Sequence, residues 1–275
     1  MSFFTQAQID KIISFAFEAG DIACDFQKSA NFVVTTKPDN SYVTSADIAV
    51  SKFLNQKLSQ EFPQIPIICE EGNLREITGE IFWLIDPIDG TSSFIEGSEE
   101  FAINIALIKD GKPIFGLLYA PRFEGGKMAV TNAQNQIALL NKEKNIKILQ
   151  YLQDGELASS KLKIVTSKKT HDSEIADYIA QIHPNFIDNF VVKHMSSATK
   201  FFLILENKVD LYITFRKIME WDTAAGQALI ELFGGKLKNL TLQNSLYVIG
   251  DDLRYKKPNF TNEFFACYRI YRSSK

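Results

Sequence analysis

The chain is poor in the residues that mark several common kinds of protein. Its 33 aspartates and glutamates outnumber its 30 lysines and arginines, so the composition gives no basic footprint for nucleic acid. The three cysteines have no CxxC spacing, and the three histidines show no ligand spacing. A disulfide scaffold and a structural zinc site are therefore both disfavoured. The cysteine pattern fits a reducing cytoplasm, where we expect the protein to be free or peripheral at the inner membrane.

Long apolar runs are also missing, and no uninterrupted apolar stretch reaches the roughly 20 residues that span a bilayer. The first residues, MSFFTQAQIDKIISFAFEAG, include Asp10 and Glu18 within an apolar pattern of helical spacing. They lack a basic segment and a small-residue cleavage site. The pattern predicts an amphipathic helix from Thr5 to about Lys28 rather than a signal peptide.

The chain of 275 residues is long enough for one large domain or two small ones. In its first half we expect a second helix near Thr44–Glu61, begun by a capping box of Thr44 and Asp47. The segments PIICEE and IFWLID are typical of short buried strands. Two apolar runs flank Asp110-Gly111, which predicts a hairpin, and GGKMAVTNAQNQIALLN indicates further antiparallel strands.

The second half has a different pattern, in which strands and helices alternate. The polar residues 141–160 predict a boundary, with a helix and antiparallel-sheet unit over residues 1–150 and an alternating unit over residues 151–275. The expected elements are strands at Lys161–Thr166, Phe186–Val192 and Val209–Thr214, and helices at Ser173–Ile182, Ser197–Asn207 and Trp221–Phe233. The chain as a whole is predicted to be a layered α/β (α+β) protein.

Four carboxylates occur at the ends of these predicted elements. Glu70 and Asp86 follow strands, Asp89 comes three residues later, and Asp222 opens a helix in EWDTAAG. Carboxylates without nearby histidine or cysteine suit a hard cation such as Mg²⁺ or Mn²⁺. Gly90 permits a tight turn that lets Asp86 and Asp89 face one point.

Each of these residues also has a simpler explanation when it is taken alone. A DxxDG segment after a strand is most often a turn whose aspartates bond local amides. Asp222 suits the start of a helix, where negative charge is favourable, and Asp47 suits a cap. An EF-hand is excluded, because counting from Asp86 puts Ile88 and Gly90 where acidic residues are needed. The joint occurrence of the whole set favours the metal site.

The segments EEG, WLIDPIDGTSSF and WDTAAG together resemble the signature regions of the inositol monophosphatase superfamily, whose members are lithium-sensitive, Mg²⁺-dependent phosphatases. The resemblance covers roughly residues 15–235. It implies an αβαβα sandwich of alternating helix pairs and sheets, with the metal site between the two halves.

The resemblance also implies a set of metal ligands. Glu70, Asp86 and the carbonyl of Ile88 would hold a first ion, and Asp86, Asp89 and Asp222 would hold a second. The cofactor is expected to be two or three Mg²⁺ ions, with Mn²⁺ as an alternative. Two such ions can generate the nucleophile and stabilise the leaving oxygen of a phosphate ester.

Catalytic roles follow from the same resemblance. Glu70 and the Thr91 hydroxyl would orient the attacking water, and Asp47 would accept a hydrogen bond from Thr91. The backbone amides of Gly90 and Thr91 suit a phosphate oxygen.

Within the superfamily, KPDNSYVTSADIA, FAINIALIKDGKPIFGLLYAP, SSATKFFLILENKVDLY and MEWDTAAGQALI are most similar to the bacterial 3′(2′),5′-bisphosphate nucleotidases. The resemblance implies a substrate site of Ser196, Ser197 and Lys200, beside Gly90, Thr91 and Asp222. Ser197 as a helix N-cap with Lys200 nearby would form an anion site; the alternative is a plain helix start with a solvated lysine. The chain departs from that branch at Ser92-Ser93, at Met195, and in lacking a Gly-Pro pair before WDTAAG.

Three functions therefore stay open. The first is hydrolysis of adenosine 3′,5′-bisphosphate to AMP and phosphate, and the second is hydrolysis of inositol monophosphate or another sugar phosphate. The third is a non-catalytic regulator that binds phosphate compounds or RNA. The partner expected is a small phosphorylated substrate, with no nucleic acid and no integral membrane segment. The sequence does not distinguish a monomer from a homodimer.

Overall fold

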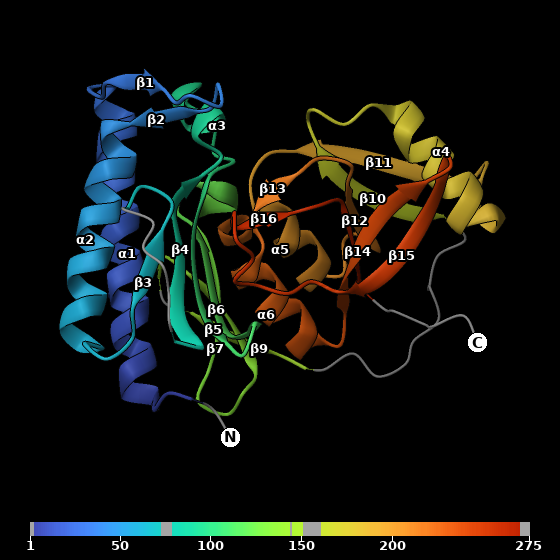
Figure 1. The fold of residues 1–275 in the computed structure, drawn as a ribbon. Helices are drawn as coiled ribbons and strands as arrows, with labels where there is room; N and C mark the ends of the chain where they lie inside the picture. The colour runs from blue at the N-terminus through green and yellow to red at the C-terminus, as the bar shows by residue number, and fades with distance from the viewer. Residues whose placement is uncertain (1–2, 73–78, 144, 151–160, 270–275) are drawn as a thin grey trace.

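The computed structural model describes residues 3–72, 79–143, 145–150 and 161–269. These residues form five layers in which helices and sheets alternate (Figure 1). Helices α1 (Gln6–Ser29) and α2 (Ser45–Glu61) cover the outer face of a first sheet. Helices α5 (Thr199–Leu205) and α6 (Ala224–Phe233) lie between this sheet and a second one. Helix α4 (Asp172–Ile182) covers the far side, so the predicted layered α/β sandwich is confirmed.

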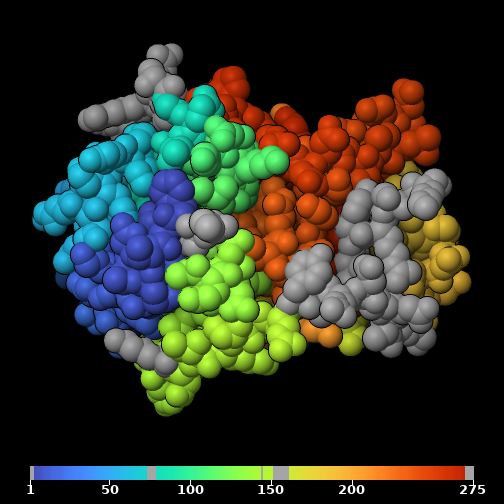
Figure 2. Space-filling view, turned by 90° about the horizontal axis from the view of Figure 1, so that it is seen from below, coloured from blue at the N-terminus to red at the C-terminus, as the bar shows by residue number. Residues whose placement is uncertain are grey.

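The two sheets come from different halves of the chain. The first has the spatial order β3 (Ile67–Cys69), β4 (Ile81–Asp89), β5 (Ala102–Lys109), β6 (Lys112–Ala120), β7 (Lys127–Thr131), β8 (Ile137–Asn141) and β9 (Ile146–Leu149). The second has the order β11 (Phe190–Met195), β10 (Leu162–Ser167), β12 (Leu211–Thr214), β17 (Phe265–Tyr268), β14 (Lys236–Gln243) and β15 (Leu246–Asp252). Seen from below, the blue and cyan outer helices and the orange-to-red second half lie on opposite sides of the molecule (Figure 2).

Shorter elements connect these layers. They are strands β1 (Val34–Thr36), β2 (Tyr42–Thr44), β13 (Ile218–Met219) and β16 (Thr261–Asn262), helix α3 (Thr91–Ile95), and 3₁₀ turns η1 (Phe123–Gly125), η2 (Pro184–Phe186) and η3 (Glu220–Asp222). In the first sheet only β3 and β4 pair in parallel among the described strands. In the second, β10 is parallel to both β11 and β12, with α4 and α5 as the crossovers.

Helix α6 contacts both sheets, and a glycine on β6 lets it approach the first sheet closely. A Cβ added to Gly116 on β6 would lie 2.4 Å from the carbonyl oxygen of Ala225 and 3.0 Å from the Cβ of Ala228. Only glycine therefore allows this close approach of backbone to backbone. The contact places η3, which precedes α6, against the end of β4 and the start of β5.

The two helix starts in the first half are confirmed at their caps. The Thr5 hydroxyl accepts from Gln8 N, and the Gln8 side chain accepts from Thr5 N. The Thr44 hydroxyl accepts from Asp47 N, and the Asp47 carboxylate accepts from Thr44 N at 2.8 Å. Each cap satisfies amides that the first helical turn leaves without a partner.

Several boundaries in the second half were predicted wrongly. The strand expected at Phe186–Val192 begins at Phe190, because Pro184 starts a 3₁₀ turn, which its fixed φ favours. The helix expected at Trp221 begins at Ala224, after η3. Of the predicted boundary at residues 141–160, residues 144 and 151–160 lie outside the described residues, and 146–149 form β9 rather than an irregular segment. The division into two domains stays a prediction.

The sequence analysis did not predict β14–β17, of which β14, β15 and β17 supply half of the second sheet. The hairpin turn between β14 and β15, at Asn244 and Ser245, has positive φ at both residues (49° and 64°), as a type I′ turn requires. No helix of the described residues is long and apolar enough to cross a membrane.

Candidate active site

The end of β4 is bulged, and the bulge brings two aspartates to one side. Asp86 pairs with Asn104 on β5, whereas Asp89 pairs with Ala102, so three steps on β4 match two on β5. Residues three apart on a regular strand would face opposite sides of the sheet, and the extra residue reverses this. Strand β4 therefore continues past Asp86, where it was predicted to end.

A third aspartate reaches the same place from the second half of the chain. Asp222 is the last residue of η3, which packs against the end of β4 and the start of β5. One carboxylate oxygen from each of Asp86, Asp89 and Asp222 lies within 4.8 Å of the others. Asp86 is buried, and Asp89 and Asp222 are partly buried. The sequence prediction that these three residues converge is thus confirmed.

The three carboxyl groups are difficult to ionise together. Burial raises the pKa of Asp86 well above its ordinary value, and the charges of Glu70, Asp89 and Asp222 raise it further. Burial, followed by the charges of Asp89 and Glu70, raises the pKa of Asp222 in the same direction. Burial raises the pKa of Asp89 to about 6, although Lys200 lowers it. A cation that contacted all three oxygens would remove this cost.

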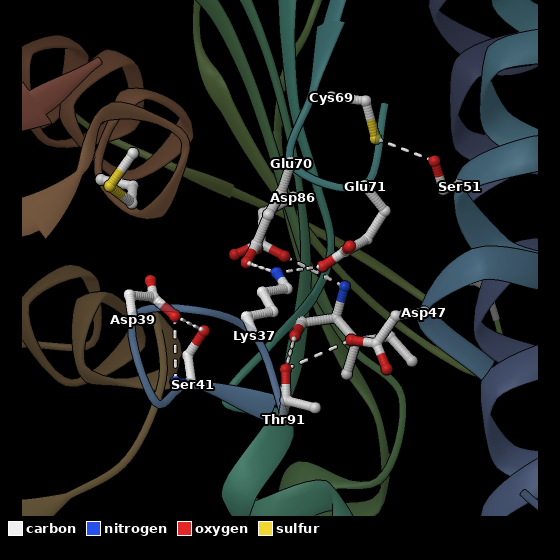
Figure 3. A network of polar contacts seen from close by, with 12 residues as sticks. Lys37, Asp39, Ser41, Asp47, Ser51, Cys69, Glu70, Glu71, Asp86 and Thr91 are labelled. Atoms are coloured by element: carbon white, nitrogen blue, oxygen red, sulfur yellow. Dashed lines mark hydrogen bonds and ion pairs between the residues drawn. The ribbon is translucent and has the colours of Figure 1, made fainter. Parts of the chain in front are cut away.

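Glu70 has a different environment from the three aspartates. Figure 3 shows Lys37, from the β1–β2 turn, reaching between Glu70 and Glu71. Its Nζ lies 2.7 Å from Glu70 Oε1 and 2.5 Å from Glu71 Oε1. These hydrogen bonds outweigh burial and raise the pKa of Lys37 above its ordinary value. The Lys37 ammonium therefore lies beside Glu70, a residue that was predicted to be a ligand of a metal ion.

The predicted hydrogen bond between Thr91 and Asp47 is present. Thr91 Oγ1 lies 3.2 Å from Asp47 Oδ1 and 3.2 Å from the carbonyl oxygen of Ile88 (Figure 3). The other Asp47 oxygen accepts from the Thr44 hydroxyl and amide. Burial raises the pKa of Asp47, and the hydrogen bonds from Thr44 lower it. The capping box of α2 thus fixes the carboxylate that accepts from Thr91.

Gly90 makes the turn that was expected of it. Its φ is +90°, and an added Cβ would lie 2.9 Å from Ser197 Cβ and 3.0 Å from the carbonyl oxygen of Glu100. A side chain here would be strained by the backbone and would clash with the loop before α5. Glycine therefore lets β4 enter α3 and lets this loop lie directly beside Asp89.

The loop of residues 195–198 contacts the acidic cluster through its backbone. Ala198 N–H donates to Asp89 Oδ2, and Ser196 N–H donates to Glu100 Oε2 at 3.0 Å. The predicted N-cap at Ser197 is wrong: Ala198 is the cap residue, and Ser197 precedes it with a φ of +55°. The structure thus brings the segment of Ser196 and Ser197 beside the aspartates, but not as a helix cap.

Lys200 is not the solvated lysine of the simpler alternative. Its side chain is 4% exposed, and its Nζ donates to the carbonyl oxygens of Ser197 and Met195. The ammonium also lies 5.2 Å from the centre of the Tyr212 ring. Burial lowers the pKa of Lys200 to about 8, although Asp89 and neighbouring acids raise it. Lys200 therefore supports the 195–198 loop from behind.

Sequence reasoning missed three residues around the cluster. Lys37 was interpreted only as part of a turn, and Glu100 was not considered. Asn104 lies opposite Asp86, is 1% exposed, and donates to the carbonyl oxygen of Trp221 at 3.4 Å. The signal for Asn104 was available, since it is the lone polar residue within the buried run of β5. Lys37 and Glu100 had no comparable signal.

The donor set fits a hard divalent cation. Every side chain in the cluster offers carboxylate oxygen, and the described histidines and cysteines do not join it. Such oxygens are the ligands that Mg²⁺ and Mn²⁺ prefer. Burial and the neighbouring acidic charges raise the pKa values of Asp86 and Asp222, so a cation bound among these carboxylates would favour their ionised forms.

Comparisons with known proteins identify the family of the chain. The sequence model described as "Inositol monophosphatase family" matches residues 6–266. The 3′(2′),5′-bisphosphate nucleotidase CysQ of Buchnera aphidicola is 33% identical over 92% of this chain and 92% of its own length. The protein of the same name from Escherichia coli K12 is 32% identical over 82% of this chain and 88% of its own.

Solved structures show the same fold. A crystal structure of CysQ from Bacteroides thetaiotaomicron, described as a bacterial member of the inositol monophosphatase family, has a TM-score of 0.74 and 23% identity, covering 98% of this chain and all of that one. An inositol monophosphatase from Anabaena has a TM-score of 0.67 and 22% identity, covering 96% of this chain and 91% of that one. The chain belongs to the inositol monophosphatase family of metal-dependent phosphatases.

Proposed function

We propose that this protein is a Mg²⁺-dependent 3′(2′),5′-bisphosphate nucleotidase, which converts adenosine 3′,5′-bisphosphate to AMP and phosphate. One observation supports it most. One of the segments by which the sequence resembles that branch begins with Ser196 to Lys200, and these residues lie against the three-aspartate cluster through the Ala198–Asp89 hydrogen bond. The relatives named CysQ support the same substrate.

The residues of the cluster divide into two ligand groups under this proposal. Glu70, Asp86 and the Ile88 carbonyl would hold one ion, and Asp86, Asp89 and Asp222 would hold the other. When bound, the ions supply an ionised water and cancel charge on the phosphoryl group. Glu70 would be freed for this role when Lys37 moves away from it.

Two other residues, Thr91 and Asp47, would orient the attacking water by a chain of hydrogen bonds. Thr91 lies 3.2 Å from Asp47, whose second oxygen is already bonded to Thr44. While Thr91 donates to Asp47, the lone pairs of its oxygen can accept a hydrogen bond from water. Hydrogen-bond donation then runs from the attacking water to Thr91, and from Thr91 to Asp47 in the first turn of α2. The first amides of α3, Gly90 and Thr91, would contact a phosphate oxygen.

The non-reacting part of the substrate would lie against the 195–198 loop. Ser196 and Ser197 are partly exposed beside the cluster. Lys200 would contribute positive charge from behind them, and to touch a second phosphate its Nζ would exchange the carbonyls of Met195 and Ser197 for phosphate oxygens.

A phosphate-release assay on three substrates tests the proposal. Adenosine 3′,5′-bisphosphate, inositol 1-phosphate and fructose 1,6-bisphosphate would each be offered with Mg²⁺, and Asp89→Asn would serve as the inactive control. We expect the highest kcat/KM for the nucleotide. A higher value for either sugar phosphate would overturn the substrate assignment but keep the phosphatase. No release from any substrate would leave the non-catalytic alternative.

A further inference from the structure

Glu220 is a buried charged residue to which the proposed reaction gives no role. It is 0% exposed and lies two residues before Asp222. Its Oε2 accepts from Lys256 N at 2.8 Å, and its Oε1 accepts from Lys257 N at 3.1 Å and from Lys257 Nζ at 2.9 Å. A buried carboxylate is tolerated only when it is paired and hydrogen-bonded, and these three donors meet that condition.

The donors belong to one segment, residues 253–262, which we call the strap. Glu220 N also donates to the carbonyl oxygen of Phe260 at 2.7 Å. Lys257 Nζ reaches past Glu220 to Asn262 Oδ1 at 2.7 Å. Strand β16 of the strap pairs with β13, which leads directly into η3 (Figure 1). The strap therefore contacts η3 at Glu220, through Lys256, Lys257 and Phe260, and contacts the preceding residues Ile218 and Met219 through β16.

The strap is also attached to the first half of the molecule. Tyr255 N donates to the carbonyl oxygen of Gly111, in the β5–β6 turn, at 3.1 Å. Lys256 Nζ lies 2.8 Å from Glu80 Oε1, just before β4. The strap therefore connects the β5–β6 turn and the start of β4, the strand whose other end carries Asp86 and Asp89, with the turn that holds Asp222.

Asp222 needs such an external support. The turn η3 has only three residues, too few for a helix to be stable by itself. The charges of Asp89 and Glu70 act on the Asp222 carboxylate and would repel it once it ionises. The hydrogen bond from Met219 N, at 3.0 Å, holds the Asp222 side chain within the turn. The strap holds η3 itself in place.

We propose that Glu220 is a positioning residue for Asp222: by binding the Lys256-Lys257 segment it fixes η3 against the end of β4 and the start of β5, so that Asp222 completes the metal site. The inference rests on the proposed metal-dependent function. It assigns to Glu220 no contact with substrate or metal.

The test measures binding of Mn²⁺ alone to the full chain, by electron paramagnetic resonance of the free ion. Wild type would be compared with Glu220→Gln and Lys257→Met. Loss of a group that orients a ligand typically lowers metal affinity about 10–100-fold. We expect Glu220→Gln to weaken at least one Mn²⁺ site by about 10-fold, and Lys257→Met, which removes only one of the three donors, to weaken the same site less.

Asp210→Asn supplies a matched control. Asp210 forms another buried ion pair in the second half, with its Oδ1 2.7 Å from Arg269 Nη2 and side-chain exposures of 11% and 7%. It precedes β12, whereas η3 comes after that strand. We expect this variant to lower the melting temperature and to leave Mn²⁺ affinity unchanged.

The outcomes separate the inference from the function on which it rests. If Glu220→Gln and Lys257→Met lose thermal stability but bind Mn²⁺ as tightly as wild type, their role is only structural and the inference is wrong. If Glu220→Gln does not fold, Lys257→Met alone decides, because its side chain is 35% exposed and its loss is better tolerated. If wild type itself binds no Mn²⁺, the metal-dependent function fails first.

Discussion

The acidic site has two sides that are neutralised in different ways. On one side, Glu70 and Glu71 share the ammonium of Lys37, which lies within 2.7 Å of both. On the other side, Asp86, Asp89 and Asp222 are close together, and no described lysine or arginine forms an ion pair with them. The first side has a cation from the chain, whereas the second side needs one from solution.

The difference follows from where the side chains come from. Lys37 lies on an exposed β1–β2 turn and has a flexible stem, so it can leave when a metal ion arrives. The aspartates are fixed by the β4 bulge and by η3, which leave little freedom to separate. We infer that Glu70 can exchange the Lys37 ammonium for a metal ion, while the three ionised aspartates repel one another until a cation binds among them. The following predictions test this difference.

The largest effect is expected for Asp89→Asn. The amide keeps an acceptor for Ala198 N–H but removes one negative charge from the cluster. Since loss of a group that only orients a metal ligand costs about 10–100-fold, loss of a ligand should lower kcat/KM by more than about 100-fold while the protein stays folded. Phosphate release and circular dichroism would be measured together. A wild-type rate at saturating Mg²⁺ would remove Asp89 from the metal site.

A smaller and more selective effect is expected for Lys200→Met, which keeps the buried stem and removes the ammonium. A charge-assisted hydrogen bond is worth roughly 1.5–3 kcal/mol. We therefore expect kcat/KM for adenosine 3′,5′-bisphosphate to fall by about 10- to 150-fold. A monophosphate substrate should lose much less. Equal losses for the two substrates would limit Lys200 to supporting the 195–198 loop.

Lys37→Met should alter metal binding by only a few-fold, and in the opposite direction. Partly exposed ion pairs contribute about 0.2–1 kcal/mol each, so freeing Glu70 from its ion pair should tighten Mn²⁺ binding by roughly 1.4- to 5-fold. Lys11→Met, which breaks the exposed Lys11–Glu61 pair away from the site, is the control. Weaker binding in Lys37→Met than in Lys11→Met would show that Lys37 helps to hold the metal rather than competing with it.

The smallest effect concerns the pH dependence of the metal-free protein. Because the pKa of Asp89 in the folded state is raised to about 6, the folded state binds its proton more tightly than the unfolded chain does. The contribution of Asp89 to the free energy of unfolding is therefore fully present at low pH, and it is lost as the pH rises from about 4 through 6. Asp86 and Asp222 act in the same direction.

Melting curves in a chelator between pH 4.5 and 7 would test this dependence. Asp89→Asn lacks one of the three groups, so its melting temperature should exceed that of wild type by a few degrees at pH 7 and should match it more closely at pH 4.5. A difference that is independent of pH would contradict the assignment of strain to the Asp89 charge.

Much of the site could be predicted from the sequence because its information is local. Asp86, Asp89 and Gly90 belong to one turn, and the capping box of Thr44 and Asp47 spans four residues. Helix α1 was predicted from its apolar period. These features depend on residues close together in the chain, where spacing determines geometry.

The parts that were missed depend on contacts between distant segments. Lys37 meets Glu70 only when the β1–β2 turn folds over β3, and Glu220 meets Lys257 only when the strap returns to η3. Strand β15 has no buried residue and β14 ends in three exposed ones, and apolar residues such as Leu242, Leu246 and Val248 are among the exposed positions, so no clear alternation of buried and exposed residues marks either strand. Burial of Lys200 likewise depends on the carbonyls of its own loop and on Tyr212.

The most direct test of the account is anomalous diffraction from crystals grown or soaked with Mn²⁺. We expect a peak in contact with carboxylate oxygens of Asp86, Asp89 and Asp222, together with displacement of Lys37 from Glu70 where a further ion binds. A structure at saturating Mn²⁺ with no peak among the three aspartates, or with peaks only elsewhere, would contradict the claim that this cluster is a metal centre.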